Sequence, residues 1–247
     1  MRHLQEPRSP ARRRWLASVG AVGASCASAD AASRTGPAIP RREAGLRLCT
    51  FGDSILDCAH YNEHGLDPGR LLIRNDDALS PEFTGKDLRS HGPARLEHRA
   101  VDGATVDSLE AQARGLAADE ASVALLTVGG NDLLRGLAGD SGPGLRRFEA
   151  GLDAFLRRLP IRPVLLGTVY DPTFGDDARN FLGVPARIAR ANHRRVNEVI
   201  AALAERYGRV ADLHAHFLTG RTSWYTRTIE PSLEGASEVR RVFLREL

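Results

Sequence analysis

The stretch Leu46-Arg47-Leu48-Cys49-Thr50-Phe51-Gly52-Asp53-Ser54-Ile55-Leu56-Asp57 decides the fold. Its first six residues form a short run bounded by a glycine, a pattern that predicts a β-strand. Beyond Gly52 we expect the chain to turn directly into a helix. Ser54 would lie at that turn, with an exposed hydroxyl and with nearby backbone N–H groups that can bind an anion. Serine is also a common helix N-cap, so this position alone does not assign it a role.

Short apolar runs alternate with longer segments of helical period along the rest of the chain, which is typical of βαβ units and a parallel sheet. The predicted strands are Leu46 to Phe51, Ala94 to Ala100, Val123 to Val128, Pro163 to Val169 and Val210 to Leu213. Apolar faces predict helices over 145–159 and 188–207, a weaker one over 106–116 and a closing helix over 234–247. The expected fold is an α/β three-layer α/β/α sandwich, flavodoxin-like, with a central parallel sheet of about five strands.

The size and composition favour one globular domain. The chain has 247 residues, of which 42% are apolar and 26% are charged, as in soluble globular proteins. We assign residues 1–45 to a leader and linker and residues 46–247 to a single domain. No run approaches the ~20 apolar residues that a membrane-spanning helix needs, so no membrane span is expected.

The net charge of +3 comes from the front of the chain. Residues 1–45 contain eight arginines against three acidic residues, a net charge of +5, which leaves −2 on the remainder. A polyanion partner needs a basic surface on the folded part of a protein. We therefore expect no nucleic-acid binding.

The basic front is followed by a weakly apolar run rich in Gly, Ala and Ser, at 15–29, with small residues suitable for cleavage after Ala29 or Ala31. This layout predicts an export signal, and Arg12-Arg13-Arg14 resembles part of a twin-arginine leader. The alternative is a disordered extension ahead of a domain that begins near Leu46. The protein is thus expected to be exported, or cytoplasmic if the leader is not functional.

Residues 58–93 show no sustained period and contain several Gly and Pro. A loop of this length inside a compact domain is usually functional or disordered. We expect it to shape the pocket beside Ser54, where His60 and His64 lie close along the chain.

Glycines and polar residues follow each of the first three predicted strands. In an open α/β sheet, ligands bind beyond the carboxyl ends of the strands. Gly52-Asp53-Ser54 follows the first strand, Asp102-Gly103 the second and Gly129-Gly130-Asn131-Asp132 the third. A glycine lets the backbone approach a ligand, and asparagine offers an amide donor. Each motif alone is more simply a turn, but together and in this order they supply the parts that acyl transfer needs.

In this order the motifs resemble those of the SGNH/GDSL hydrolases, a family of lipases and acylhydrolases. Gly52-Asp53-Ser54 is similar to block I, Gly103 to the glycine of block II and Gly129-x-Asn131-Asp132 to block III. The resemblance extends over nearly the whole chain from Leu46. It implies that Ser54 attacks an acyl carbon, and that the oxyanion is held by the Ser54 N–H, the Gly103 N–H and the Asn131 side chain.

The fourth block departs from the family's pattern. In the family, a segment similar to Asp-x-x-His-Pro before the last helix supplies the general base and the carboxylate that orients it. In the matching segment here, Glu230 stands in the His position before Pro231, and Arg227 stands in the Asp position. Both polar partners are therefore replaced.

Three explanations are open. Glu230 could accept the serine proton if burial raised its pKa, although Arg227 beside it would lower that pKa. Alternatively, His214 or His216, after the fifth predicted strand, could supply an imidazole oriented by Asp212 or Glu230. The site could also be catalytically inactive and retained for binding. We favour the imidazole, because histidine titrates near neutral pH.

The expected function is serine-dependent hydrolysis of a small-molecule carboxylic ester through an acyl-enzyme intermediate. This chemistry requires no metal and no organic cofactor. His214-x-His216 with Asp212 lacks a clear fourth ligand, so we do not predict a metal site there. The alternative is a non-catalytic protein that uses the same scaffold to bind an acylated or carbohydrate ligand.

Overall fold

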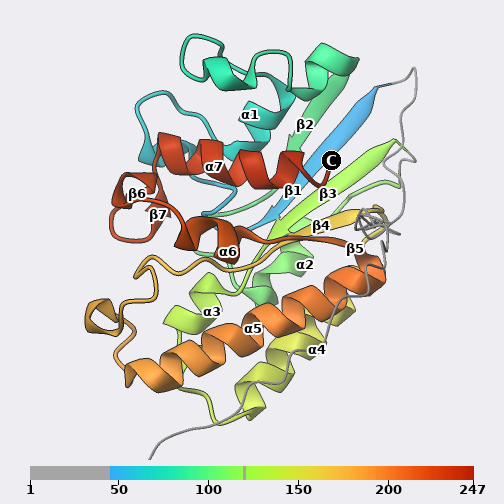
Figure 1. Ribbon diagram of the computed structural model, residues 1–247. Coiled ribbons are helices and arrows are strands. Elements are labelled where there is room, and N and C mark those ends of the chain that lie inside the picture. The colour runs from blue at the N-terminus through green and yellow to red at the C-terminus, as the bar shows by residue number, and fades with distance from the viewer. Residues whose placement is uncertain (1–44, 119–120) are drawn as a thin grey trace, which may run out of the picture. The chain divides into compact units, whose positions relative to one another are not determined.

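The computed structural model describes residues 45–118 and 121–247 (Figure 1). The predicted export signal, its cleavage positions and the arginine run lie outside the described residues. Among the described residues, no helix is both long enough and apolar enough to cross a membrane.

A five-stranded parallel sheet forms the centre of the described domain, with strand order β2-β1-β3-β4-β5 (Figure 1). The strands are β1 (Leu46–Gly52), β2 (Ala94–His98), β3 (Ser122–Thr127), β4 (Val164–Gly167) and β5 (Gly208–Ala211). The predicted α/β fold with about five parallel strands is confirmed. β3 and β4 are buried along their whole length, as expected for strands that are covered on both faces.

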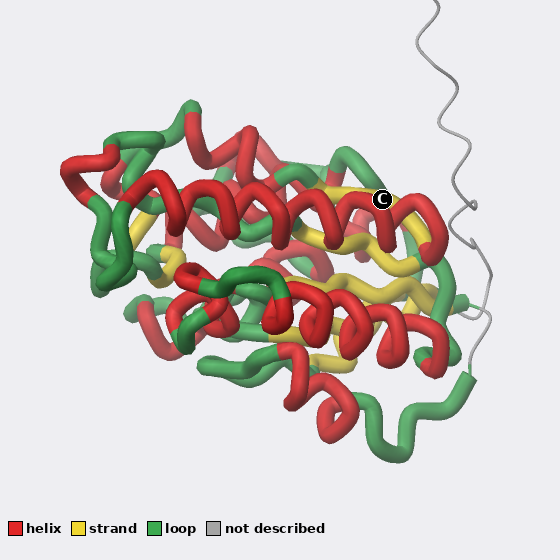
Figure 2. The backbone as a smooth tube through the Cα atoms, turned by 90° about the horizontal axis from the view of Figure 1, so that it is seen from below, coloured by secondary structure: helices red, strands yellow, loops and turns green. Residues whose placement is uncertain are grey.

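Helices cover both faces of the sheet, and Figure 2 shows them in red on either side of the yellow strands. One face carries α2 (Leu109–Gln112), α4 (Pro143–Arg158) and α5 (Ala186–Tyr207), and the other α1 (Pro68–Ile73), α6 (Leu213–Leu218) and α7 (Leu233–Leu244). The short α3 (Gly130–Leu134) follows β3 directly. The shortest elements are η1 (Ala59–Tyr61), η2 (Pro81–Phe83), η3 (Leu88–His91), η4 (Val106–Ser108), η5 (Leu137–Gly139), η6 (Asp177–Arg179), η7 (Thr222–Trp224), β6 (Tyr225–Thr226) and β7 (Glu230–Pro231).

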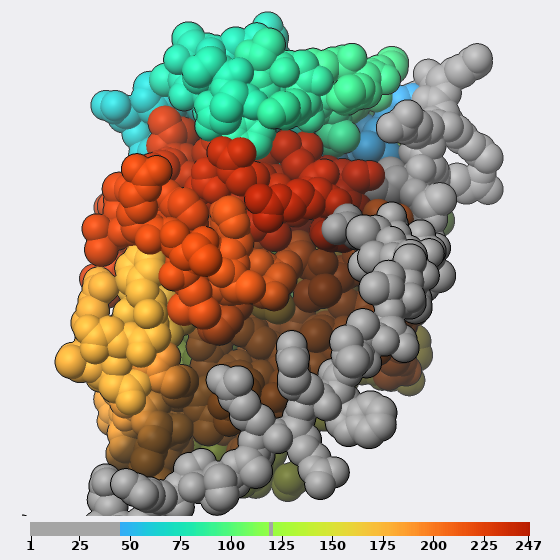
Figure 3. Space-filling model, in the orientation of Figure 1, coloured from blue at the N-terminus to red at the C-terminus, as the bar shows by residue number. Residues whose placement is uncertain are grey.

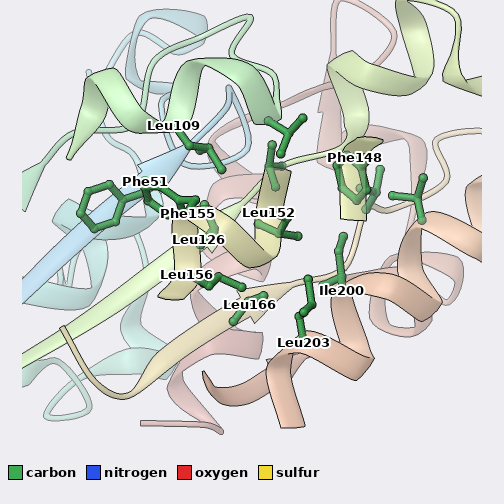
Figure 4. Packing of buried hydrophobic residues seen from close by; sticks show 14 of the residues in the cluster. Phe51, Leu109, Leu126, Phe148, Leu152, Phe155, Leu156, Leu166, Ile200 and Leu203 are labelled. Atoms are coloured by element: carbon green, nitrogen blue, oxygen red, sulfur yellow. The ribbon is translucent and has the colours of Figure 1, made fainter. Parts of the chain in front are cut away.

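Alternation along the strands divides the core into two layers. Side chains of successive strand residues point to opposite faces, so Phe51 packs with the α4 and α5 layer while Leu48 packs with the α7 layer. Figure 4 shows the first layer, in which Phe51 and Leu126 of the sheet lie near Phe155 of α4. The rings of Phe51 and Phe155 meet edge to face, with centroids 5.9 Å apart.

Residues 58–93, predicted as a functional or disordered loop, contain a helix and three short helical turns. α1 buries Leu71 and Leu72 and packs against α7. Arg240 of α7 is itself buried, donates a hydrogen bond of 2.6 Å to the Asn75 side chain and lies 3.5 Å from the centre of the Phe83 ring. In Figure 3 this segment, coloured teal, lies directly against the red α7. The segment is therefore part of the packed domain.

The fifth strand ends earlier than predicted, and this changes the setting of both candidate histidines. The side chain of Asp212 accepts a hydrogen bond from the Ala215 N–H at 3.0 Å and caps α6. His214 and His216 therefore lie on a helix and not at the end of a strand.

Candidate active site

The turn that carries Ser54 begins at Gly52, the last residue of β1. The φ angle of Gly52 is 110°, and a Cβ atom here would lie 1.6 Å from the Thr127 carbonyl oxygen, so no other residue fits. The Gln112 side-chain amide also holds this position, accepting from the Gly52 N–H at 2.7 Å and donating to its carbonyl at 2.9 Å. The predicted helix after Ser54 is a hydrogen-bonded turn instead, in which the Asp53 carbonyl accepts from the N–H of Leu56.

Asp53 is buried beneath this turn. Its carboxylate accepts hydrogen bonds from the Thr127 hydroxyl at 2.8 Å and the Ile55 N–H at 3.2 Å. Burial raises the pKa of Asp53 to about 7, and the bond from Thr127 opposes that rise. Asp53 therefore braces the Ser54 turn against β3.

Asn131, the second residue of α3, lines the same cavity as Ser54. Its side-chain amide donates to the Ala104 carbonyl at 3.1 Å, which leaves its second N–H for another acceptor. Asp132 accepts from the Val106 N–H at 3.3 Å, and burial raises the pKa of Asp132 to about 6. The start of α3 is thus tied to the segment that follows β2.

Gly103 lies in that segment, with a φ angle of 75°, a conformation that favours glycine. Its carbonyl accepts a hydrogen bond of 3.0 Å from Arg135. Gly103 lines an open groove next to the Ser54 cavity, together with Asp102 and Arg135. The structure therefore joins the Gly103 and Asn131 segments to each other, with Asn131 in the cavity and Gly103 beside it.

Glu230 lies at Ser54. The Ser54 side chain lies close enough to its carboxylate to lower the pKa of Glu230, and one carboxylate oxygen is buried with no hydrogen-bond partner among the described residues. Burial raises the pKa of Glu230, and the charge of Asp102 acts in the same direction. The Ser54 side chain and the charges of His60 and Arg227 act against that rise without reversing it. A carboxylate with a raised pKa beside a serine side chain can act as a proton acceptor.

Arg227 occupies the position where the family has its orienting carboxylate, but its side chain packs on an aromatic ring. Its guanidinium lies 5.0 Å from the centre of the Tyr61 ring. Arg227 and Thr228 have φ angles of 47° and 78°, which are uncommon for residues other than glycine. As expected, the charge of Arg227 lowers the pKa of Glu230, but burial outweighs this charge and the pKa is raised above its ordinary value.

A polar cluster that the sequence did not reveal surrounds Asp102. The Tyr61 hydroxyl donates to its carboxylate at 2.5 Å, and His60 Nε2 lies 3.2 Å from the same oxygen. The Asp102 N–H donates to the Asp57 carboxylate at 2.9 Å. The only sequence signal was the position of Asp102 after the second strand, because its partners come from residues 57–61.

The structure does not bring His214 or His216 into the Ser54 cavity. His216 Nε2 lies 2.7 Å from the Glu238 carboxylate, and its ring stacks on Trp224. The His214 ring meets His193 edge to face, and burial lowers the pKa of His214. Across residues 45–118 and 121–247, no three His, Cys, Asp or Glu side chains form a group suited to a metal ion.

His193 of α5 lines the Ser54 cavity. Its Nε2 lies 2.8 Å from the Val169 carbonyl oxygen and is therefore the donor. Burial lowers the pKa of His193 and favours its neutral form. The residue fixes the backbone after β4.

Comparison with known proteins gives a consistent result. A family model described as the GDSL-like Lipase/Acylhydrolase family matches residues 50–236. No curated protein matches the chain.

Among solved structures, an acetylxylan esterase from Geobacillus stearothermophilus is 21% identical, with a TM-score of 0.56 over 83% of this chain and 96% of that chain. A member of the lipolytic G-D-S-L family from Veillonella parvula is 17% identical, with a TM-score of 0.56 over 81% of this chain and 97% of that chain. An alpha/beta hydrolase from the metagenome of Lake Arreo, Spain, is 22% identical, with a TM-score of 0.57 over 82% and 94%. These similarities show the fold.

Proposed function

From the premise that this chain belongs to the GDSL-like Lipase/Acylhydrolase family, we propose that it hydrolyses carboxylic esters, with Ser54 as nucleophile and Glu230 as general base. One observation carries the proposal: the Glu230 carboxylate lies beside the Ser54 side chain, and Ser54 and Asn131 line the same cavity. We propose Glu230 in place of the imidazole favoured by the sequence, because His216 contacts Glu238 and the His214 ring packs against His193.

The proposed reaction has two steps. In the first, the Ser54 proton moves to Glu230 while the serine oxygen bonds to the acyl carbon, and the carbonyl becomes an oxyanion that accepts from Asn131 and from the Gly103 N–H. Collapse of this intermediate breaks the bond to the alcohol, which takes the proton from Glu230. In the second step, water gives a proton to Glu230, attacks the acyl carbon and releases the acid, and the proton returns to Ser54.

The surroundings of Glu230 suit this role. A carboxylate with an ordinary pKa is a weak base at neutral pH, and burial corrects this by raising the pKa of Glu230. One oxygen of the Glu230 carboxylate is buried and has no hydrogen-bond partner among the described residues, so it is free to accept a hydrogen bond from the attacking water. The charges of Arg227 and His60 act against this rise.

A fluorophosphonate probe tests the proposal directly. Wild-type protein should be labelled at Ser54, Ser54→Ala should not be labelled, and Ser223→Ala, which removes an exposed serine, should label like wild type. Glu230→Gln should be labelled much more slowly. If wild-type protein stays unlabelled at neutral and mildly alkaline pH, the esterase proposal fails, and a protein that binds an acylated or carbohydrate ligand on this scaffold becomes the better reading.

A further inference from the structure

The cavity beside Ser54 is mainly apolar along its length. It is bounded by α3, α5 and the loops around 169–173 and 180–182. Its apolar lining includes Leu133, Val169, Phe181, Leu182, Ala186 and Ala189. Phe181 is 41% exposed and Leu134 is 44% exposed, so large apolar side chains also border its mouth. The space next to the proposed nucleophile therefore suits an uncharged hydrocarbon group.

The polar side chains of the lining already have partners within the protein. The Asp171 carboxylate accepts from Arg190 at 3.0 Å and from the Thr173 hydroxyl at 2.6 Å. Three further bonds each join a cavity side chain to a backbone carbonyl: Asn180 to Val184, His193 to Val169 and Tyr170 to Ile229. A ligand with polar groups along its length would compete with these bonds, whereas a hydrocarbon would not.

The volume of the cavity indicates the length of that hydrocarbon. The cavity measures about 100 Å³. A group the size of one water molecule needs about 10–15 Å³, and an apolar cavity of about 150 Å³ accepts the six carbons of benzene. An acetyl methyl group would leave most of the space empty, and an unbranched chain of about four to six carbons would fill it.

We propose that this cavity is the acyl pocket and that the enzyme prefers esters of unbranched, uncharged acids of about four to six carbons. This inference rests on the proposed function, because the acyl group is the part of the substrate that stays bonded to Ser54. Ala186, in the first turn of α5, lines the cavity, so a larger side chain there reduces the space for the acyl chain.

A series of aryl esters with acyl chains of two to ten carbons tests the preference. For wild-type protein we expect kcat/KM for butyrate or hexanoate to exceed that for acetate by about tenfold or more. Ala186→Phe should lower kcat/KM for hexanoate about tenfold and leave acetate within about twofold. Arg187→Phe is the matched control, because it places the same ring at the next, exposed position outside the cavity and should keep the wild-type profile.

Two results would overturn the inference alone: acetate as the best substrate of the wild-type enzyme, or a chain-length preference that follows the alcohol and not the acyl group. If the proposed function is wrong, the protein will hydrolyse none of the esters. In that case a binding measurement still tests whether the cavity binds an acyl chain. Ser54→Ala protein should bind hexanamide more tightly than acetamide, by up to about fourfold per buried methylene. Ala186→Phe in that background should abolish the difference, and equal binding of both amides would overturn the pocket.

Discussion

The two halves of the candidate site are held in different ways. The half with Ser54 and Asn131 follows the buried strands β1 and β3, and Gln112 and Asp53 brace it with hydrogen bonds of 2.7 to 3.2 Å. The half with Glu230 lies on the short antiparallel β6–β7 hairpin, which includes two residues of positive φ and whose Ile229 carbonyl accepts a hydrogen bond of 2.6 Å from Tyr170. A base carried on such a hairpin can be exchanged without disturbing the sheet, whereas the nucleophile cannot.

The largest effect separates the two candidate bases. Glu230→Gln should lower kcat on an aryl butyrate by about 10³-fold, within the usual range for loss of a general base. His216→Ala and His214→Ala should each leave kcat within about threefold, because neither ring lines the Ser54 cavity. A large loss of kcat in either histidine variant, together with an active Glu230→Gln variant, would show that the general base is a histidine and not Glu230.

A substitution of Asn131 tests the half of the site that contains Ser54 and Asn131. Asn131→Ala should lower kcat by about 10²-fold to 10³-fold with little change in KM, because the lost donor acts on the developing oxyanion. Asn131 also bonds the Ala104 carbonyl, so a structural effect must be measured separately. Asp132→Asn serves as the control, since it weakens the neighbouring bond to Val106 without removing an oxyanion donor. Equal losses in both variants would assign Asn131 a structural role only.

The pH profile tests the electrostatics around Glu230. Only the ionised carboxylate can accept the serine proton, so kcat/KM should fall as pH drops through a pKa that burial has raised. Asp102→Asn removes a negative charge that raises this pKa, and the acid limb should move to lower pH. Asp53→Asn removes another carboxylate with a raised pKa, about 7, so a limb that disappears in this variant belongs to Asp53. An acid limb unmoved by Asp102→Asn would contradict the assignment.

The smallest effect concerns stability. His216→Ala removes the 2.7 Å contact with Glu238 and the stacking on Trp224, both partly buried. We expect the free energy of unfolding to fall by about 1–2 kcal/mol in urea denaturation, with activity unchanged. Unchanged stability together with lost activity would indicate that His216 acts in catalysis.

Local patterns predicted most of the fold and the nucleophile half of the site. The five strands, the helical faces on α4 and α5 and the glycines beside Ser54 depend on neighbours in sequence, and such signals are visible in one chain. The end of β5 was misplaced because the cap made by Asp212 competes with strand continuation. The approach of Glu230 to Ser54 and the cluster around Asp102 depend on tertiary packing, as does the burial that outweighs the charge of Arg227. No spacing rule in the sequence reports these contacts.

The buried Arg240 has a consequence for biosynthesis. Its partners Asn75 and Phe83 belong to the segment before β2, but α7 follows every other helix and strand that the structure describes. On the ribosome, residues 58–93 therefore emerge long before α7, and the surface of α1 that packs against α7 stays uncovered until that helix arrives. Exposed apolar surface of this kind is prone to aggregate. Completion of the domain is thus expected to follow translation of its last helix, and not to proceed steadily from the front.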